Sequence, residues 1–543
     1  MTGCRYLSDR SRHLRPSRSK VDSAYSILHF QKDAPQDSIL WKDSIAQRLG
    51  TLSTAAFCRH HNWALLNSLA NDKDVTFSYT KPDATSDNAD VPIAHQAGVN
   101  CLTIDQHEGR YLISGGADST IRLWDLEEPH ESSSTYKPLT TLPRGAPSSH
   151  THSLTSLSIY PFDPTPTTLI STSYDKTLKL TSITPSNLTP IHTFELDFIP
   201  YAHALSPLPD SSPLIAVGTA HPAIRLLDLR SGLSTHSLSG PNGAIYSLCW
   251  SPRTSYVLCS GSTDGKILFF DIRRANASFA SLDLDDAVGI VGEIPSTGLG
   301  ARPSSLHLDF NAVAHNGPVT SVQWTPSGDK LVTVGHDQRI RIWDAASGRN
   351  DLVHFGPRIR NERQGELKPL ISPPGTCLPG RESLFWPNDD GRGMIFQHHL
   401  REGHMLKILR TEGVKIAEVQ ASNKRARTGI GGSGTSNISR LTSGGRINSM
   451  IWRVGAPLGE GIEMYTAHGD GRICAWKPVM KDADYEEIDA DGDHGIKKPA
   501  IWTAGNGTED IDVAVDDAER RRKRKRDLLG DLVQGLAKKP MPF

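Results

Sequence analysis

A short pattern recurs along this chain, and it limits the possible folds more than any other feature of the sequence. Each copy begins near an Ala-His pair, continues through short apolar runs rich in Val, Ile and Leu, and ends near a Trp-Asp pair. The two clearest copies span residues 94–125 and 314–344. Their apolar runs are bounded by Gly, Asp or Ser, which is typical of strands joined by tight turns. Repetition of this kind predicts an all-β fold made of similar small sheets.

Polar residues stand at matching offsets in the two clear copies. The separation between the first histidine and the turn aspartate is 23 residues in one copy and 22 in the other. A hydroxyl residue and a tryptophan complete each set. The predicted hydrogen-bond networks are His95, Ser114, Asp118 and Trp124 in the first copy, and His315, Thr333, Asp337 and Trp343 in the second. Such a network, when buried and fully paired, makes a small sheet rigid.

Weaker copies follow the same plan. They lie at residues 157–182, 214–228, 245–271 and 447–476, and a degenerate seventh unit is assigned to residues 356–437. Closing such units into a ring removes exposed sheet edges. We therefore predict a seven-bladed β-propeller over residues 83–480. Its units exceed the ~40–45 residues usual for such a repeat, so insertions are expected near residues 130–150, 274–313, 356–380 and 421–440.

The repeats resemble those of WD40 β-propellers, and an ordered set of segments is similar to the Cockayne syndrome group A family. The similar segments are residues 215–232, 248–253, 270–275, 314–317 and 331–344. The resemblance implies a substrate receptor of a cullin 4-type RING ubiquitin ligase that acts in transcription-coupled nucleotide excision repair. It also implies a damaged-DNA-binding adaptor and the ligase core as partners, with repair factors or RNA polymerase II as candidate substrates.

Two arginines partly match an adaptor-binding element that the resemblance implies. Receptors of this type often carry a W-D-x-R element, and Arg230 and Arg273 stand at its Arg position, although both copies lack the Trp. A guanidinium suits bidentate pairing with a carboxylate of a partner. The alternative for both residues is an ordinary exposed arginine at the end of a strand.

The resemblance also places a helical, adaptor-docking segment ahead of the propeller, here at residues 37–82. Asp37 would cap a first helix, and residues 64–70 would form a second, short one. The apolar stripe of the first helix consists of Trp41, Ile45, Leu49 and Leu52. Trp41, Ile45 and Leu49 are the expected adaptor-binding residues, and packing of this helix on its own propeller is the alternative.

Strong charges of opposite sign lie near the ends of the chain and largely cancel, which leaves a formal net charge of -1. Residues 1–36 form a basic leader, and residues 481–543 an acidic and then basic tail; disorder is expected for both. The basic run consists of Arg520, Arg521, Arg522, Lys523, Arg524, Lys525 and Arg526. It is typical of a nuclear localisation signal, so a nuclear protein is expected, with direct nucleic-acid contact possible only through this tail.

No motif of catalysis or cofactor binding stands out in the sequence. His398, His399 and His404 lack cysteines or carboxylates at the expected ligand spacing, and residues 489–500 depart from a calcium loop at its glycine and its last glutamate. The prediction is a protein that is not an enzyme, with no cofactor, no metal and no membrane contact. A WD40 scaffold of another nuclear complex, in chromatin or RNA processing, is the alternative function.

Overall fold

The computed structural model describes most of the repeat region. The described residues are 46–50, 53–79, 92–127, 135–146, 149–163, 168–184, 186–209, 213–274, 278–284, 288–290, 313–378, 380–411, 445–453 and 462–479. They belong to one compact unit, Met1–Asp482. The predicted basic leader, the charged tail with its basic run, and the insertion near residues 421–440 lie outside the described residues. None of the described helices has the length and apolar character needed to cross a membrane.

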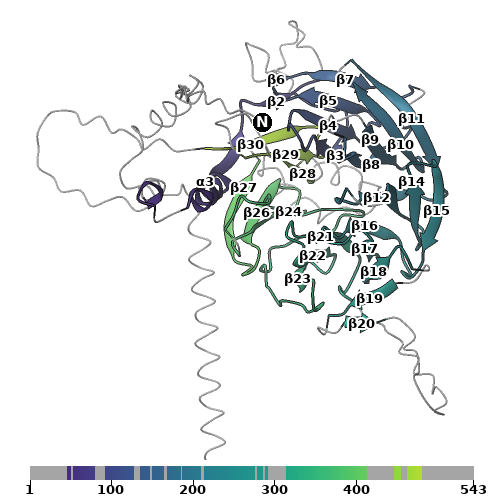
Figure 1. Ribbon diagram of the computed structural model, residues 1–543. Helices are drawn as coiled ribbons and strands as arrows, with labels where there is room; N and C mark the ends of the chain where they lie inside the picture. Colours follow the sequence, from purple (N-terminus) through teal and green to yellow (C-terminus); the bar gives the residue numbers. More distant parts are fainter. Residues whose placement is uncertain are drawn as a thin grey trace, which may run out of the picture. The chain divides into compact units, whose positions relative to one another are not determined.

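Seven antiparallel sheets follow one another around a ring, which confirms the predicted seven-bladed β-propeller (Figure 1). Each sheet is one blade. Within a blade, the strands follow one another in chain order from the inner strand outward, except that the outer strand of blade 7 comes from residues before blade 1.

The strands of the first four blades are as follows. Blade 1 has β3 (Val99–Ile104), β4 (Tyr111–Gly116), β5 (Ile121–Asp125) and β7 (Pro138–Leu142). Blade 2 has β8 (Leu154–Ile159), β9 (Thr168–Ser173), β10 (Thr177–Thr184) and β11 (Asn187–Glu195). Blade 3 has β12 (Pro200–Leu205), β13 (Leu214–Thr219), β14 (Ile224–Asp228) and β15 (Leu233–Leu238). Blade 4 has β16 (Ile245–Trp250), β17 (Val257–Ser262), β18 (Ile267–Asp271), β19 (Ser278–Leu282) and β20 (Val288–Ile290).

The remaining elements complete the ring. Blade 5 has β21 (Val319–Trp324), β22 (Lys330–Gly335) and β23 (Ile340–Asp344). Blade 6 has β24 (Leu370–Ile371), β25 (Ser383–Pro387), β26 (Met394–His399) and β27 (Met405–Arg410). Blade 7 has β28 (Ile447–Arg453), β29 (Glu463–His468), β30 (Ile473–Pro478) and β1 (Leu69–Asp72). A helix, α3 (Thr54–Ser68), precedes β1, and the short strands β2 (Thr76–Phe77) and β6 (Thr135–Tyr136) pair in parallel.

Burial explains why the inner three strands of a blade are apolar and the outer strand is not. All five residues of β5 are buried, whereas most residues of β11, an outer strand, are exposed. Apolar clusters join adjacent blades; one holds Val332 and Ile342 of blade 5 together with Leu384 and Trp386 of blade 6. Each blade therefore needs a neighbour on both of its faces to keep its core out of water.

A strand that precedes blade 1 in the sequence closes the ring. β1 pairs antiparallel with β30, with Leu69 opposite Pro478 and Asp72 opposite Ala475, and Leu69 is buried. Residues 64–68 of the predicted short helix form the end of α3, but Leu69 and Ala70 are in β1, and the propeller therefore begins before the predicted residue 83. Helix α3 ends at Ser68, and the next residues are extended because the open edge of β30 offers them backbone partners.

The segment ahead of the propeller also differs from its prediction. Asp37, Trp41, Ile45 and Leu52 lie outside the described residues. Leu49 lies in a turn with Gly50, whose positive φ of 72° ends the local helical geometry. The described helix is α3, which begins after Ser53; the Ser53 hydroxyl accepts a hydrogen bond from the Ala56 amide.

Three of the predicted insertions contain strands of the blades. The outer strands β7 and β19 fall in residues 130–150 and 274–313, and the inner strand β24 falls in residues 356–380. These strands are short and lie in segments rich in Pro, Ser and Gly, which is why their sequences read as loops. The unit predicted as degenerate over residues 356–437 is a sheet of four strands, β24 to β27, without a histidine–tryptophan network.

The closing strand predicts a clear stability difference between two leucines. Replacing buried Leu69 by Ala should lower the free energy of unfolding by about 2–5 kcal/mol, because it leaves a cavity under the closing strand. Replacing Leu49, which is 72% exposed, by Ala should change it by less than about 0.5 kcal/mol. Urea unfolding followed by tryptophan fluorescence measures both, and equal effects would contradict closure through β1.

Candidate protein-binding surfaces

Side-chain networks hold the two clear repeats together at the predicted residues. In blade 1, the imidazole of His95 contacts the Asp118 carboxylate at 3.2 Å and the Ser114 hydroxyl at 2.7 Å, and the Trp124 indole donates to Ser114 at 2.9 Å. In blade 5, His315 contacts Asp337 at 3.0 Å and Thr333 at 2.8 Å. The Trp343 indole donates to Thr333 at 2.9 Å. The structure thus brings together each predicted set of four residues.

A third network in blade 2 was missed in the sequence. His150 contacts Asp175 at 2.9 Å and Ser171 at 2.8 Å, while Thr181 stands where blades 1, 5 and 7 have tryptophan. The histidine–aspartate separation is 25 residues, close to the 23 of blade 1, so this spacing would have found the network. The missing tryptophan hid it.

Blade 7 builds the same contact from a different position. Here the Trp476 indole donates to Thr466 at 3.0 Å, and Thr466 contacts His468 at 2.9 Å. His468 occupies the turn position that is Gly116 in blade 1. A Cβ at Gly116 would lie 2.4 Å from the ring of His95, so blade 1 needs glycine at this turn, as blade 5 does at Gly335. In blade 7 the turn residue itself supplies the imidazole.

These histidine, hydroxyl and aspartate groups act in folding and are not accessible to a substrate. His95, Ser114, His315 and Thr333 are all fully buried, and each hydroxyl is occupied by an indole. Burial lowers the pKa of His315, although the neighbouring Asp337 opposes this shift. Burial also opposes ionisation of Asp337, but hydrogen bonds from His315 and Arg341 hold its pKa well below the usual range. The neutral imidazole and the ionised carboxylate are the stable forms.

The lowered histidine pKa predicts a loss of stability in mild acid. A histidine whose folded pKa lies below its unfolded value of about 6.5 contributes stability above pH 6.5, which is lost as the pH falls. The thermal midpoint should therefore drop between about pH 6.5 and pH 5. His315→Asn should lower the midpoint at pH 8 and flatten this dependence, whereas the control His152→Asn, at an exposed residue, should do neither. An unchanged slope in His315→Asn would contradict the assignment.

A β-bulge recurs near the start of the inner strand in six blades. The register between the first two strands shifts there by one residue, and the bulged residues are Asn100, Thr155, Tyr201, Tyr246, Thr320 and Asn448. A bulge turns its side chain away from the regular alternation. Asn448 donates to the Val99 carbonyl of blade 1 at 2.7 Å, and Asn100 donates to the Leu154 carbonyl of blade 2 at 2.8 Å. These side chains join neighbouring blades.

Residues 361–368 connect inner strands of three other blades. Asn361 donates to Thr320 of blade 5 at 2.7 Å, and the Arg363 guanidinium donates to the Asn448 side chain of blade 7 at 2.9 Å. The Ser247 hydroxyl of blade 4 donates to the Glu366 carboxylate at 2.8 Å. Burial raises the pKa of Glu366, although Lys368 at 3.1 Å opposes this shift. This region was predicted as an insertion, but it is part of the inner wall.

The antiparallel strands place the loops of each blade alternately on two faces of the ring. We define the lower face as the one with the loops between the first and second strands and between the third and fourth. The upper face has the loops between the second and third strands and between blades. Arg230 and Arg273 follow the third strands of blades 3 and 4, so both lie on the lower face. The C-terminal end of helix α3 also lies there, because it leads directly into β1, the fourth strand of blade 7.

The two arginines on the lower face differ in their surroundings. Arg273 donates to both carboxylate oxygens of Asp271 at 3.0 and 2.9 Å and lies 3.3 Å above the ring of Tyr256, and its side chain is 60% exposed. Arg230 is exposed, and its charge acts on Tyr160. Tyr160 lines a shallow cleft of about 100 Å³ together with Phe162, Leu205, Ser206, Pro209, Pro213 and Leu214. Arg230 is therefore the arginine better placed for a partner.

Helix α3 adds aromatic residues that the sequence interpretation did not select. Leu65 and Leu66 are buried, whereas Phe57 and Trp63 are half-exposed. The backbone carbonyls of Asn67 and Leu69 accept hydrogen bonds from Lys407 at 3.2 and 2.7 Å, which fixes the end of the helix to blade 6. The helix thus packs on its own propeller along one side and keeps other side chains accessible.

The upper face carries a tyrosine ladder, which we define as Tyr174, Tyr201 and Tyr246 of blades 2, 3 and 4. The ring centroids of Tyr174 and Tyr201 are 6.4 Å apart and those of Tyr201 and Tyr246 are 5.0 Å apart, both edge-to-face. Tyr174 is 41% exposed, and nearby Phe198, which packs on His221, is 40% exposed. Exposed tyrosines with fixed orientations are typical of protein-binding surfaces.

Comparison with known proteins gives the family of the chain. The family model "WD domain, G-beta repeat" matches residues 90–125, 137–182, 232–271 and 309–344. The WD repeat-containing protein ATCSA-1 of Arabidopsis thaliana is 30% identical over 349 residues, which cover 54% of this chain and 76% of that protein. The chain belongs to the WD-repeat proteins.

Other relatives match a smaller part of the chain. The ribosome biogenesis protein ytm1 of Neosartorya fischeri is 28% identical over 46% of this chain and 52% of its own length. The CCR4-associated factor 4 homolog of Vanderwaltozyma polyspora is 29% identical over 28% of this chain and 26% of its own length. The chain therefore spans about half of the former relative and a quarter of the latter.

Proposed function

We propose that this WD-repeat protein is the substrate-recognition subunit of a cullin-RING ubiquitin ligase in transcription-coupled nucleotide excision repair. The observation that carries the proposal is the similarity to ATCSA-1 over three quarters of that protein's length. Its name matches the Cockayne syndrome group A family that the sequence resembles. The propeller would hold substrates in the nucleus, while the ligase core supplies the ubiquitin transfer; the chain itself would not be an enzyme.

The lower face is the proposed binding site of the damaged-DNA-binding adaptor. It combines Arg230 beside an apolar cleft, Arg273 in a neighbouring blade, and helix α3 with its half-exposed aromatic residues Phe57 and Trp63. Aromatic and arginine side chains contribute most of the binding energy in many interfaces. Arg273 already pairs with Asp271, so it would contribute less than Arg230.

The upper face is the proposed substrate surface. The tyrosine ladder spans three blades, and its rings support one another by edge-to-face contacts. A rigid aromatic surface loses little conformational entropy when it binds a partner. Repair factors or RNA polymerase II would contact this face while the adaptor occupies the opposite one.

A WD40 scaffold in ribosome biogenesis is the second candidate function. The similarity to ytm1 over 46% of this chain favours it, and the propeller would then bind assembly factors in place of ligase subunits. Affinity purification followed by mass spectrometry, before and after transcription-blocking DNA damage, separates the two. Recovery of the cullin 4-type core supports the ligase receptor, and recovery of pre-ribosomal proteins without that core contradicts it.

Reversing the charge of Arg230 tests the lower face. Arg230→Glu should reduce co-purification with the adaptor at least tenfold. The introduced carboxylate would repel the adaptor carboxylate that we propose Arg230 binds. Arg273→Glu should have a smaller effect. Arg392→Glu is the matched control, since Arg392 is an exposed arginine in an upper-face loop. Equal adaptor recovery with Arg230→Glu and Arg392→Glu would refute the assignment.

Removing an exposed ring of the ladder tests the upper face. Tyr174→Ala should reduce substrate recovery several-fold and leave adaptor recovery unchanged, because Tyr174 lies on the opposite face from Arg230. Tyr160→Ala, on the lower face, is the matched control. Substrate recovery that stays the same in Tyr174→Ala would show that the ladder is not the substrate surface.

A further inference from the structure

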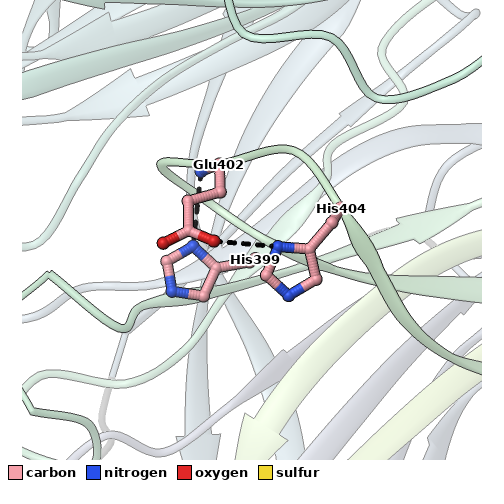
Figure 2. A group of neighbouring side chains, drawn as sticks. All are labelled: His399, Glu402 and His404. Atoms are coloured by element: carbon pink, nitrogen blue, oxygen red, sulfur yellow. Dashed lines mark hydrogen bonds and ion pairs between the residues drawn. The ribbon is translucent and has the colours of Figure 1, made fainter.

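The turn between β26 and β27 in blade 6 brings together three side chains with metal-binding atoms. They are His399, Glu402 and His404, and one ligand atom from each lies within 4.8 Å of the others (Figure 2). The two imidazole rings are stacked, with centroids 5.2 Å apart and an angle of 14° between the planes. The sequence interpretation rejected a metal site at these histidines, because it did not consider Glu402 within the same turn.

The backbone of this turn is held in place, so the side chains do not meet by chance rotation of a loose loop. The His399 amide donates to the His404 carbonyl at 2.9 Å, and the Gly403 amide donates to the His399 carbonyl at 2.8 Å. Gly403 has a φ of 75°, and a Cβ there would lie 2.6 Å from the His354 carbonyl oxygen. The turn therefore packs against residues 353–354 and accepts only glycine at this position.

Partial burial of His399 favours its neutral imidazole, the form that can donate an electron pair to a metal ion. Burial lowers the pKa of His399, while Glu402 and Glu382 oppose this shift and His404 and Arg381 add to it. The Glu402 carboxylate contacts the His404 imidazole at 3.1 Å. Arg401, in the middle of the turn, pairs with Glu382 at 3.2 Å and Asp329 at 3.3 Å. Its positive charge is thereby neutralised by two carboxylates outside the site.

Two imidazoles and one carboxylate form a donor set that suits zinc and similar divalent transition metals. In the tetrahedral geometry usual for zinc, ligand atoms about 2.1 Å from the ion lie about 3.4 Å apart. The present separations of up to 4.8 Å therefore need an adjustment of at most about 1.4 Å. Glu402 and His404 are exposed and can make it by side-chain rotation.

We propose that His399, Glu402 and His404 form a surface site for a divalent transition-metal ion of the zinc type. Three protein ligands leave a coordination position open for water or for a ligand from a partner. β26 is the third strand of blade 6, so the turn lies on the lower face, the same face as Arg230 and α3. The proposal concerns metal binding by this chain alone and does not depend on the adaptor assignment.

Titration of the full chain with Zn²⁺ and with Co²⁺ tests the proposal. Isothermal titration should show one equivalent of zinc that is lost, or weakened at least tenfold, in His404→Asn and in His399→Asn. Glu402→Gln should weaken it less, because the two imidazoles remain. Co²⁺ should give visible d–d absorption that zinc displaces. Affinity should fall as the pH drops below about 6.5, since protons then compete for the imidazoles.

Matched controls separate this site from other metal-binding groups of the chain. His152→Asn, at an exposed histidine of another blade, should leave the stoichiometry and affinity unchanged. Metal-free thermal midpoints of the Glu402 and His404 variants should equal that of the parent, because both side chains are exposed. Zinc binding that is absent in the parent, or identical in the parent and in His404→Asn, would overturn the proposal.

Discussion

The pairing of β1 with β30 is the interaction on which the other contacts of the propeller depend. Every blade has apolar residues on both faces, so an open array would leave two terminal blades exposed to water. Blade 7 receives its outer strand from the residues that precede blade 1, and this joins the two ends of the repeat array. The bulged asparagines Asn448 and Asn100 continue the connection along the inner wall. Ring closure is thus supported at the outer and the inner edges of the blades.

Those parts of the fold could be predicted from the sequence whose apolar residues lie close together along the chain. Buried inner strands and the histidine–aspartate spacing revealed the ring, its blade number and two of the networks. The third network was missed because Thr181 replaces tryptophan in blade 2. Outer strands such as β7 and β19 were taken for insertions because they are short and lie in segments rich in Pro, Ser and Gly. The helix boundary at Ser68 was missed because the extended conformation of Leu69 depends on β30, about four hundred residues later.

The candidate surfaces were harder to predict, because they combine residues that are far apart in the sequence. Tyr174, Tyr201 and Tyr246 meet only through the packing of three blades, and two of them occupy the bulge that recurs in inner strands. The same bulge holds asparagine or threonine in four other blades, where it joins strands and blades by hydrogen bonds. The same β-bulge therefore joins blades by hydrogen bonds in one part of the propeller and presents tyrosine side chains at the surface in another part. Arg230, in contrast, could be selected from the sequence because it follows a recognisable strand end.

Helix α3 continues directly into β1, with no linker between Ser68 and Leu69. A partner that binds α3 therefore holds the strand that closes the ring. A partner that binds only the folded state raises the free energy of unfolding. The gain increases with the ratio of partner concentration to dissociation constant and is about 2.7 kcal/mol when that ratio is one hundred. A subunit without its partner would open at β1 more often, and proteases would degrade it sooner. The cellular amount of this protein would then follow the supply of the protein that binds α3.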